Sequence, residues 1–236
     1  MKLACVSDIH GKFGFKWPKA DVLIIAGDIF PTYSRNNRTD AFIQSMYVND
    51  TFAPAMFDLL DKGAYDHIIV VPGNHDRVFL SSEFNVREKL DSISDSFHLL
   101  IDQEAMIDGK VFYGSPWTPW FFGEHWVYNL PKDNSEAARL HWDRIPDDTE
   151  VLITHGPPHE ILDKTSSGQL AGCKSLKKKV ASLENLKLHV FGHIHEGYGQ
   201  KKWCSKPLSE PQKLFVNASI CTLAYNPINA IQVVEI

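Results

Sequence analysis

The sequence lacks an apolar run long enough to cross a membrane, which would take about 20 consecutive residues in a helix. The first residues lead into an apolar, strand-like segment, with no basic region followed by a signal segment. We therefore expect a cytoplasmic protein that makes no membrane contact. We also expect one domain over residues 1–236, because the chain contains no repeat, low-complexity segment or linker.

Cysteine is scarce, and positive charge is not in excess. The four cysteines have no C-x-x-C spacing, which favours reduced thiols over a disulfide framework or a thiolate metal site. Lys and Arg number 24 against 29 Asp and Glu, a formal net charge of -5. This balance argues against an extended interface with duplex nucleic acid, which requires many cations.

Five short apolar runs are present, and each ends at a cluster of polar residues. The runs cover residues 3–6, 22–26, 68–71, 151–153 and 188–191, and their composition is typical of buried strands. The clusters that follow them are Asp8/His10, Gly27/Asp28, Gly73/Asn74/His75/Asp76, Thr154/His155/Gly156 and Gly192/His193/Ile194/His195. Because sites in open α/β sheets lie beyond the carboxyl ends of strands, these clusters predict one shared site.

The residue types in the clusters indicate metal binding. Asp8 and His10, like His193 and His195, are separated by one residue, so an extended backbone would place each pair on one face. Carboxylate, carboxamide and imidazole ligands without thiolate suit Mn, Fe or Zn. Two divalent ions about 3.5–4 Å apart would neutralise the clustered acids and could share one bridging carboxylate. Asp28 is our candidate for that bridge.

The order D-x-H, G-D, G-N-H-D, T-H-G and G-H-I-H resembles that of the calcineurin-like metallophosphoesterases. Residues 114–121, 126–131, 154–158, 191–199 and 216–219 are further similar to the subfamily of metallophosphoesterase domain-containing proteins and to class III cyclic nucleotide phosphodiesterases. The resemblance implies an α/β fold of two packed mixed β-sheets flanked by α-helices.

The resemblance also implies roles for individual residues. It places one metal on Asp8, His10, Asp28 and His195, and the second on Asp28, Asn74, His155 and His193. His75 would lie near the leaving group, where an imidazole can assist a departing oxygen, and Asp76 would orient it.

The expected activity is hydrolysis of small phosphodiesters by a metal-bridging hydroxide, with Mn as the ion that supports activity in vitro. Cyclic nucleotides such as 2',3'-cAMP or 3',5'-cAMP are the leading substrates by resemblance. The alternatives are a phosphomonoesterase, a nuclease using the same site, and a catalytically weak metal-binding interaction protein.

Several residues outside the motifs are candidates for substrate contact. Trp120 and Phe121 belong to an aromatic segment, residues 117–128, which could stack on a base, anchor a long loop to the core, or form a homodimer contact. His159 follows the His155 turn, and Arg35 follows Asp28 in a polar loop from which it could reach a phosphate oxygen.

Outside the five runs, the patterns predict further helices and strands. Residues 39–62 favour two helices, the second opened by Pro54, and residues 81–93 favour a helix capped by Ser81 or Ser82. Residues 97–112 predict two strands around the turn Asp108-Gly109, and residues 175–183 predict a helix. Residues 214–217, 219–223 and 230–234 are expected to form strands that close a second sheet.

Overall fold

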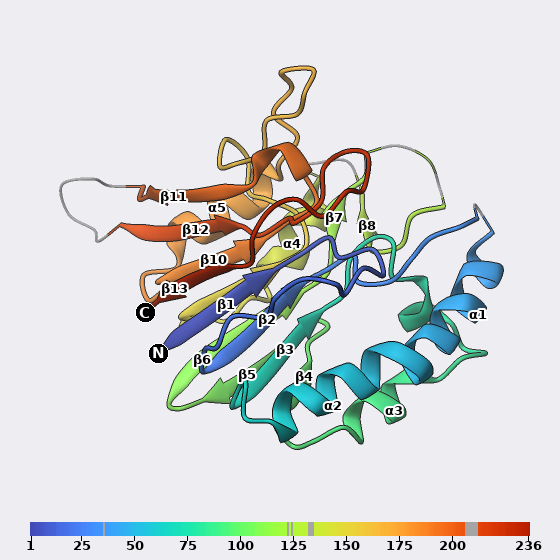
Figure 1. Ribbon diagram of the computed structural model, residues 1–236. Helices are drawn as coiled ribbons and strands as arrows, with labels where there is room; N and C mark the ends of the chain where they lie inside the picture. Colours follow the sequence, from blue (N-terminus) through green and yellow to red (C-terminus); the bar gives the residue numbers. More distant parts are fainter. Residues whose placement is uncertain (35, 122, 124, 132–134, 206–211) are drawn as a thin grey trace.

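The computed structural model describes residues 1–34, 36–121, 123, 125–131, 135–205 and 212–236, and it consists of two β-sheets packed face to face with helices outside them (Figure 1). The first sheet has the strand order β13-β1-β2-β3-β4 and the second β11-β12-β10-β9-β6-β5. Both sheets are mixed, because antiparallel β13, β11 and β5 lie at the edges of otherwise parallel strands. The predicted fold class is confirmed.

The strands of the first sheet are β1 (Lys2–Val6), β2 (Val22–Ala26), β3 (His67–Val71), β4 (Phe97–Leu99) and β13 (Gln232–Glu235). Those of the second are β5 (Gln103–Ile107), β6 (Lys110–Ser115), β9 (Val151–Thr154), β10 (Leu188–Phe191), β11 (Gly199–Trp203) and β12 (Lys213–Asn217). A short parallel pair consists of β7 (Thr118–Pro119) and β8 (Asn129–Leu130).

Alternation along the buried strands produces a separate apolar layer on each side of a sheet. In β2, Leu23 and Ile25 pack with Phe52 and Met56 of the helical layer, whereas Ile24 belongs to the core between the two sheets. A third apolar cluster joins the outer face of the second sheet to its helices. Because both faces of each sheet are covered, the central strands are continuously apolar rather than alternating with polar residues.

Three helices cover the first sheet, α1 (Asn37–Tyr47), α2 (Ala53–Asp61) and α3 (Val86–Asp91), and α4 (Glu136–Trp142) and α5 (Lys174–Ser182) cover the second (Figure 1). The Asn36 side chain caps α1 by accepting from the backbone N–H groups of Arg38 and Thr39. A π-helical turn, Val48–Phe52, joins α1 to α2. Pro54 lies in the first turn of α2, where its missing N–H costs no helical hydrogen bond.

The structure confirms the five predicted strands and the turn at Asp108-Gly109, which connects β5 to β6. The predicted helix at 81–93 is shorter, and it begins after Asn85 instead of at Ser81 or Ser82. Residues 97–99 pair with β3 of the first sheet and lie outside the hairpin.

Two expectations for the C-terminal region were wrong. The strand expected at 230–234 is β13, which pairs with β1 in the first sheet and places the two termini side by side (Figure 1). Residues 219–223, all of them described, make only isolated bridges instead of a strand. The first error concerns pairing between opposite ends of the chain, which local sequence does not determine. Among the described residues, no helix is both long and apolar enough to span a bilayer.

Candidate metal centre and active site

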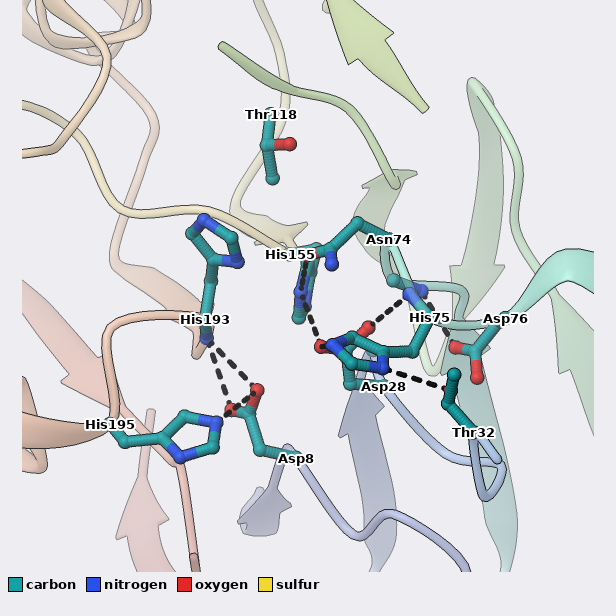
Figure 2. Close-up of polar contacts among 12 residues, drawn as sticks. Asp8, Asp28, Thr32, Asn74, His75, Asp76, Thr118, His155, His193 and His195 are labelled. Atoms are coloured by element: carbon teal, nitrogen blue, oxygen red, sulfur yellow. Dashed lines mark hydrogen bonds and ion pairs between the residues drawn. The ribbon is translucent and has the colours of Figure 1, made fainter. Parts of the chain in front are cut away.

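The five polar clusters converge at the carboxyl ends of parallel strands from both sheets (Figure 2). Asp8 follows β1, Asp28 follows β2 and Asn74 follows β3 in the first sheet. His155 follows β9, and His193 follows β10, in the second sheet. The site therefore lies where the ends of the two sheets meet, and it collects side chains from segments far apart in sequence.

The backbone turns sharply at four of the predicted ligands. Asp8, His10, Asp28 and His193 have φ angles of 56°, 47°, 52° and 67°, in the left-handed region that non-glycine residues rarely adopt. Such conformations persist only where surrounding structure enforces them, and they cluster at functional sites. Here they turn each side chain out of its strand and into the shared site.

Two glycines permit the close approach of these segments. Gly27 has a φ of 95°, and a Cβ at this position would overlap the imidazole of His155. A Cβ at Gly192 would overlap Ser7 Oγ and Asp8 Oδ2. Both positions therefore require glycine, as expected for a strand end where backbone lies against ligand side chains.

Within the described part of the chain, three overlapping groups of side chains could each hold a metal ion, because their ligand atoms lie within 4.8 Å of one another. These groups are Asp8/His10/His195, His10/Asp28/His75 and Asp28/His155/His193. Asp28 belongs to two of the groups and lies between the other ligands. Asn74 Oδ1 lies 2.9 Å from His155 Nε2 and so adjoins the third group. All seven predicted metal ligands are brought together.

Backbone carbonyls determine which nitrogen of two histidines faces the site. His155 Nδ1 donates to the carbonyl of Ala26 at 3.0 Å, and His195 Nδ1 donates to that of Thr222 at 2.9 Å. Both Nε2 atoms then point into the site. His155 Nε2 lies 3.2 Å from Asp28 Oδ2, and His195 Nε2 lies 3.2 Å from Asp8 Oδ1. This second hydrogen bond is typical of histidines that bind metal through the other nitrogen.

Electrostatics keep the two carboxylates ionised. Burial alone would raise the pKa of Asp28, but the neighbouring, hydrogen-bonded His155 outweighs burial and holds that pKa well below its usual value. Burial likewise opposes ionisation of Asp8, but the hydrogen-bonded His195 lowers its pKa. Both groups are therefore available as anionic ligands at neutral pH.

Two of the histidines are held neutral. Burial lowers the pKa of His10 to about 4. Burial and the neighbouring His155 together lower the pKa of His193 to about 3. His10 Nε2 is also buried and has no hydrogen-bond partner within the described part of the chain. The lone pair on a neutral imidazole nitrogen, next to two ionised carboxylates, can bind a divalent cation. The residues of the site therefore fit a metal centre.

His75 lies at the edge of the site and is fixed on two sides (Figure 2). Its backbone N–H donates to Asp28 Oδ1 at 2.8 Å, and its Nδ1 is hydrogen-bonded to Thr32 Oγ1 at 2.9 Å. Asp76 instead accepts from the backbone N–H groups of Ile29, Phe30 and Gly73, which ties the turn after β3 to the turn after β2. Burial raises the pKa of Asp76 to about 7. These contacts favour Thr32 as the orienting partner of His75.

The predicted substrate contacts lie in different places. The Phe121 ring is 4.9 Å from that of His193, so this residue borders the site. The Trp120 side chain is 44% exposed. His159 lies 3.6 Å from Asp163 in the loop after β9, and Arg35 lies outside the described residues.

Residues that were not among the predicted site residues also border the site. Trp126 lies with its ring 4.5 Å from that of His75, and Tyr225 lies 4.5 Å from His10. Asn217 donates to the backbone carbonyls of Ile194 and Leu162, and so supports the turn that carries His193 and His195. The aromatic segment contained a signal for Trp126, but no motif marked Tyr225.

Comparisons with known proteins agree with this geometry. The family model for calcineurin-like phosphoesterases matches residues 1–197. The human metallophosphoesterase domain-containing protein 1 is 33% identical over 257 residues, covering 100% of this chain and 71% of the relative. The UPF0046 protein K07C11.7 of Caenorhabditis elegans is 30% identical and covers 94% of this chain and 70% of the relative.

A solved structure shares the fold. TT1561 of Thermus thermophilus superposes with a TM-score of 0.55 at 14% identity, covering 92% of this chain and 88% of the other. The family model accounts for all five motif clusters, and the human relative is similar over the full chain. This chain therefore belongs to the calcineurin-like phosphoesterase family.

Proposed function

We propose that the protein is a dinuclear-metal-dependent phosphodiesterase that hydrolyses small phosphodiesters, with the cyclic nucleotides 2',3'-cAMP and 3',5'-cAMP as leading substrates. The observation that carries this proposal is the position of Asp28, which shares one potential metal group with His10 and another with His155 and His193. A carboxylate so placed can bridge two ions, the arrangement used in two-metal hydrolysis.

In this proposal, the first metal site consists of Asp8, His10, Asp28 and His195, and the second of Asp28, Asn74, His155 and His193. Two bound ions, with Mn as our candidate for activity in vitro, would activate water and polarise the phosphoryl group. The protein contributes ionised carboxylates, inward-facing Nε2 atoms and a rigid set of strand ends that hold the ligands at a fixed separation.

His75 is placed to assist the leaving oxygen. Burial lowers its pKa despite the opposing charge of Asp28, which favours a neutral imidazole. If the Thr32 hydroxyl donates to Nδ1, the remaining proton is on Nε2, which faces Asp28 at 3.8 Å. A donor at this position can stabilise negative charge on the departing alcohol oxygen.

The distribution of cations supports a diester over a monoester. Arg77 borders the cavity beside His75, but its guanidinium is ion-paired with the buried Asp40. Lys12, on the same cavity, donates to the neutral backbone carbonyl of Tyr225 and keeps its positive charge, which matches the single negative charge of a diester. A diester has one negative charge where a monoester has two, so it needs less additional positive charge around the phosphoryl group.

Hydrolysis of two model esters tests the proposed function. Metal-stripped protein is assayed with bis(p-nitrophenyl) phosphate and p-nitrophenyl phosphate, with and without Mn²⁺. We expect metal-dependent hydrolysis with a higher kcat/KM for the diester. Preference for the monoester would instead identify a phosphatase, and metal binding without hydrolysis of either ester would indicate an interaction protein.

Replacing Thr32 with Val should lower kcat, because valine has nearly the same shape but cannot hydrogen-bond to His75 Nδ1. A neutral hydrogen bond contributes about 0.5–1.5 kcal/mol, so the expected loss in kcat is roughly 2- to 10-fold. The measurement is steady-state hydrolysis of bis(p-nitrophenyl) phosphate at saturating Mn²⁺.

Thr32→Ser is the matched control, because serine retains the hydroxyl group. It should keep most of the wild-type kcat. Equal losses in both variants, or no loss in Thr32→Val, would contradict a role for this hydroxyl in orienting His75.

A further inference from the structure

A cavity of about 560 Å³ opens beside the metal centre. Two of its lining residues, His10 and His75, also belong to the potential metal groups, so a molecule in the cavity would be directly beside the reacting phosphoryl group. The cavity is also lined by Lys12, Arg77, Trp126 and Tyr225.

Two aromatic side chains flank His75 in this cavity. The Trp126 ring centroid lies 4.5 Å from that of His75, and the Tyr225 centroid lies 6.1 Å from it. Tyr225 also makes an edge contact with His10, at 4.5 Å between centroids. Anything bound next to His75 on this side would therefore meet two aromatic rings.

The Trp126 ring contacts a buried cation, the guanidinium of Arg77. The Arg77 guanidinium carbon lies 5.6 Å from the centre of the Trp126 ring, a cation–π contact. Arg77 is itself fixed by its ion pair with Asp40 and by donating to the backbone carbonyl of Ser34. These contacts restrict the Trp126 ring before any ligand binds.

The loop that carries Tyr225 is hydrogen-bonded to the same carbonyl as a candidate metal ligand, His195. Tyr225 N–H donates to the carbonyl of Thr222 at 2.8 Å, and that same carbonyl accepts from His195 Nδ1. Lys12 donates to the Tyr225 carbonyl. Tyr225 has a φ of 58°, so the loop adopts a conformation that places its ring over His10. Both aromatic walls are thus preorganised relative to His75.

We propose that this cavity binds a planar heterocyclic base carried by the sugar on the leaving-oxygen side of the scissile P–O bond, an inference that rests on the proposed phosphodiesterase function. His75 is the group placed to assist the leaving oxygen, and the cavity begins at His75, so the sugar that carries this oxygen directs its base into the cavity. In a cyclic nucleotide the P–O bond breaks, the leaving oxygen becomes a hydroxyl of the same ribose, and the base stays in the cavity. Stacking on aromatic side chains is tolerant of base identity and strengthens binding by roughly 5- to 150-fold per base. Trp126 and Tyr225 are therefore specificity-determining residues.

The location differs from the one predicted for Trp120 and Phe121, although Trp126 belongs to the same aromatic segment. Phe121 contacts His193, at the other metal group, and neither Trp120 nor Phe121 is among the residues that line this cavity. The base is thus assigned to the His75 side of the centre, and the Phe121 ring, which also stacks on that of Trp126 at 6.0 Å between centroids, lies behind this wall toward His193.

The kinetic test compares two esters that differ only in the base. 2',3'-cAMP and methyl β-D-ribofuranoside 2,3-cyclic phosphate have the same cyclic ester, and only the first contains adenine. For the Mn²⁺-loaded wild-type protein, we expect a kcat/KM at least about 10-fold higher for 2',3'-cAMP. In Tyr225→Leu and Trp126→Leu, this ratio should fall to within about 3-fold of one.

Phe57→Leu is the control, because Phe57 is an exposed aromatic residue on α2 that does not line the cavity. It should retain the wild-type ratio. If the ratio of the two kcat/KM values stayed at the wild-type value in both cavity variants, the proposal would be overturned. An equal loss of kcat/KM for both esters would also overturn it, because such a loss would reflect damage to the metal centre that both esters share.

Binding is measured separately so that the two proposals can fail independently. Dissociation constants of AMP and ribose 5-phosphate are determined with Mn²⁺-loaded wild-type protein and both cavity variants. If AMP binds more tightly than ribose 5-phosphate, and this difference is lost in the Trp126 and Tyr225 variants, the base site is supported. That result would hold even if no ester were hydrolysed, and only the proposed function would then fail. Equal affinities for AMP and ribose 5-phosphate would overturn the base site, whatever the hydrolysis results.

Discussion

Asp28→Asn should abolish metal-dependent hydrolysis, with a loss of kcat/KM greater than about 100-fold. Mutation of residues that merely support metal ligands costs 10- to 100-fold, and Asp28 is proposed as the ligand shared by both ions. Asparagine keeps the size of the side chain but removes the negative charge that attracts His155 and His75. The measurements are kcat/KM for bis(p-nitrophenyl) phosphate and bound metal per chain, which should fall below the wild-type value.

Asp102→Asn is the matched control for Asp28→Asn. Asp102 is also a hydrogen-bonded carboxylate, although it is partly exposed where Asp28 is buried, and it accepts from Ser115 and Trp117, outside the three potential metal groups. Its metal content should equal that of the wild type. If Asp28→Asn kept both its metal content and its activity, the assignment of Asp28 as the bridge would be wrong.

Asp40→Ala should lower the free energy of unfolding by about 3–5 kcal/mol, because it leaves the buried Arg77 guanidinium without its counter-charge. Asp40 is fully buried, pairs with Arg77 and also accepts from the backbone N–H groups of Tyr33 and Ser34 at 3.0 Å each. The loss is measured by urea denaturation of the metal-loaded protein.

Two further variants separate the buried charge from other effects. Adding Arg77→Met to Asp40→Ala should recover part of the lost stability, because an apolar side chain needs no counter-charge. Glu83→Ala breaks the exposed Arg38–Glu83 ion pair and should leave the denaturation midpoint nearly unchanged. A stable Asp40→Ala protein would show that Arg77 finds another partner or reaches solvent.

The sequence predicted the site better than it predicted the sheets. Strand ends followed by Asp and His are local patterns, and parallel strands bring such ends to one edge, so Asp8, Asp28 and His155 could be assigned together. The partner of β13 could not be predicted, because Gln232 pairs with Cys5 from the opposite end of the chain. Periodicity reports which face of a strand is buried, but it does not identify the neighbouring strand.

The residues around the ligands could not be predicted for a related reason. Thr32 and Tyr225 reach His75 and His10 through loops whose course depends on tertiary packing. The Arg77–Asp40 pair likewise joins the turn after β3 to α1. Metal ligands recur at characteristic separations in the sequence, but these contacts do not. The cavity that these residues form could therefore be recognised only in the folded structure.

A titration of metal-stripped protein with Mn²⁺ tests the two-ion account most directly. Bound metal and hydrolysis of bis(p-nitrophenyl) phosphate are followed in the same samples as the ratio of Mn²⁺ to protein increases. We expect two ions to bind per chain and hydrolysis to rise with the second. Full activity without metal or with one ion, or two bound ions without any hydrolysis, would contradict it.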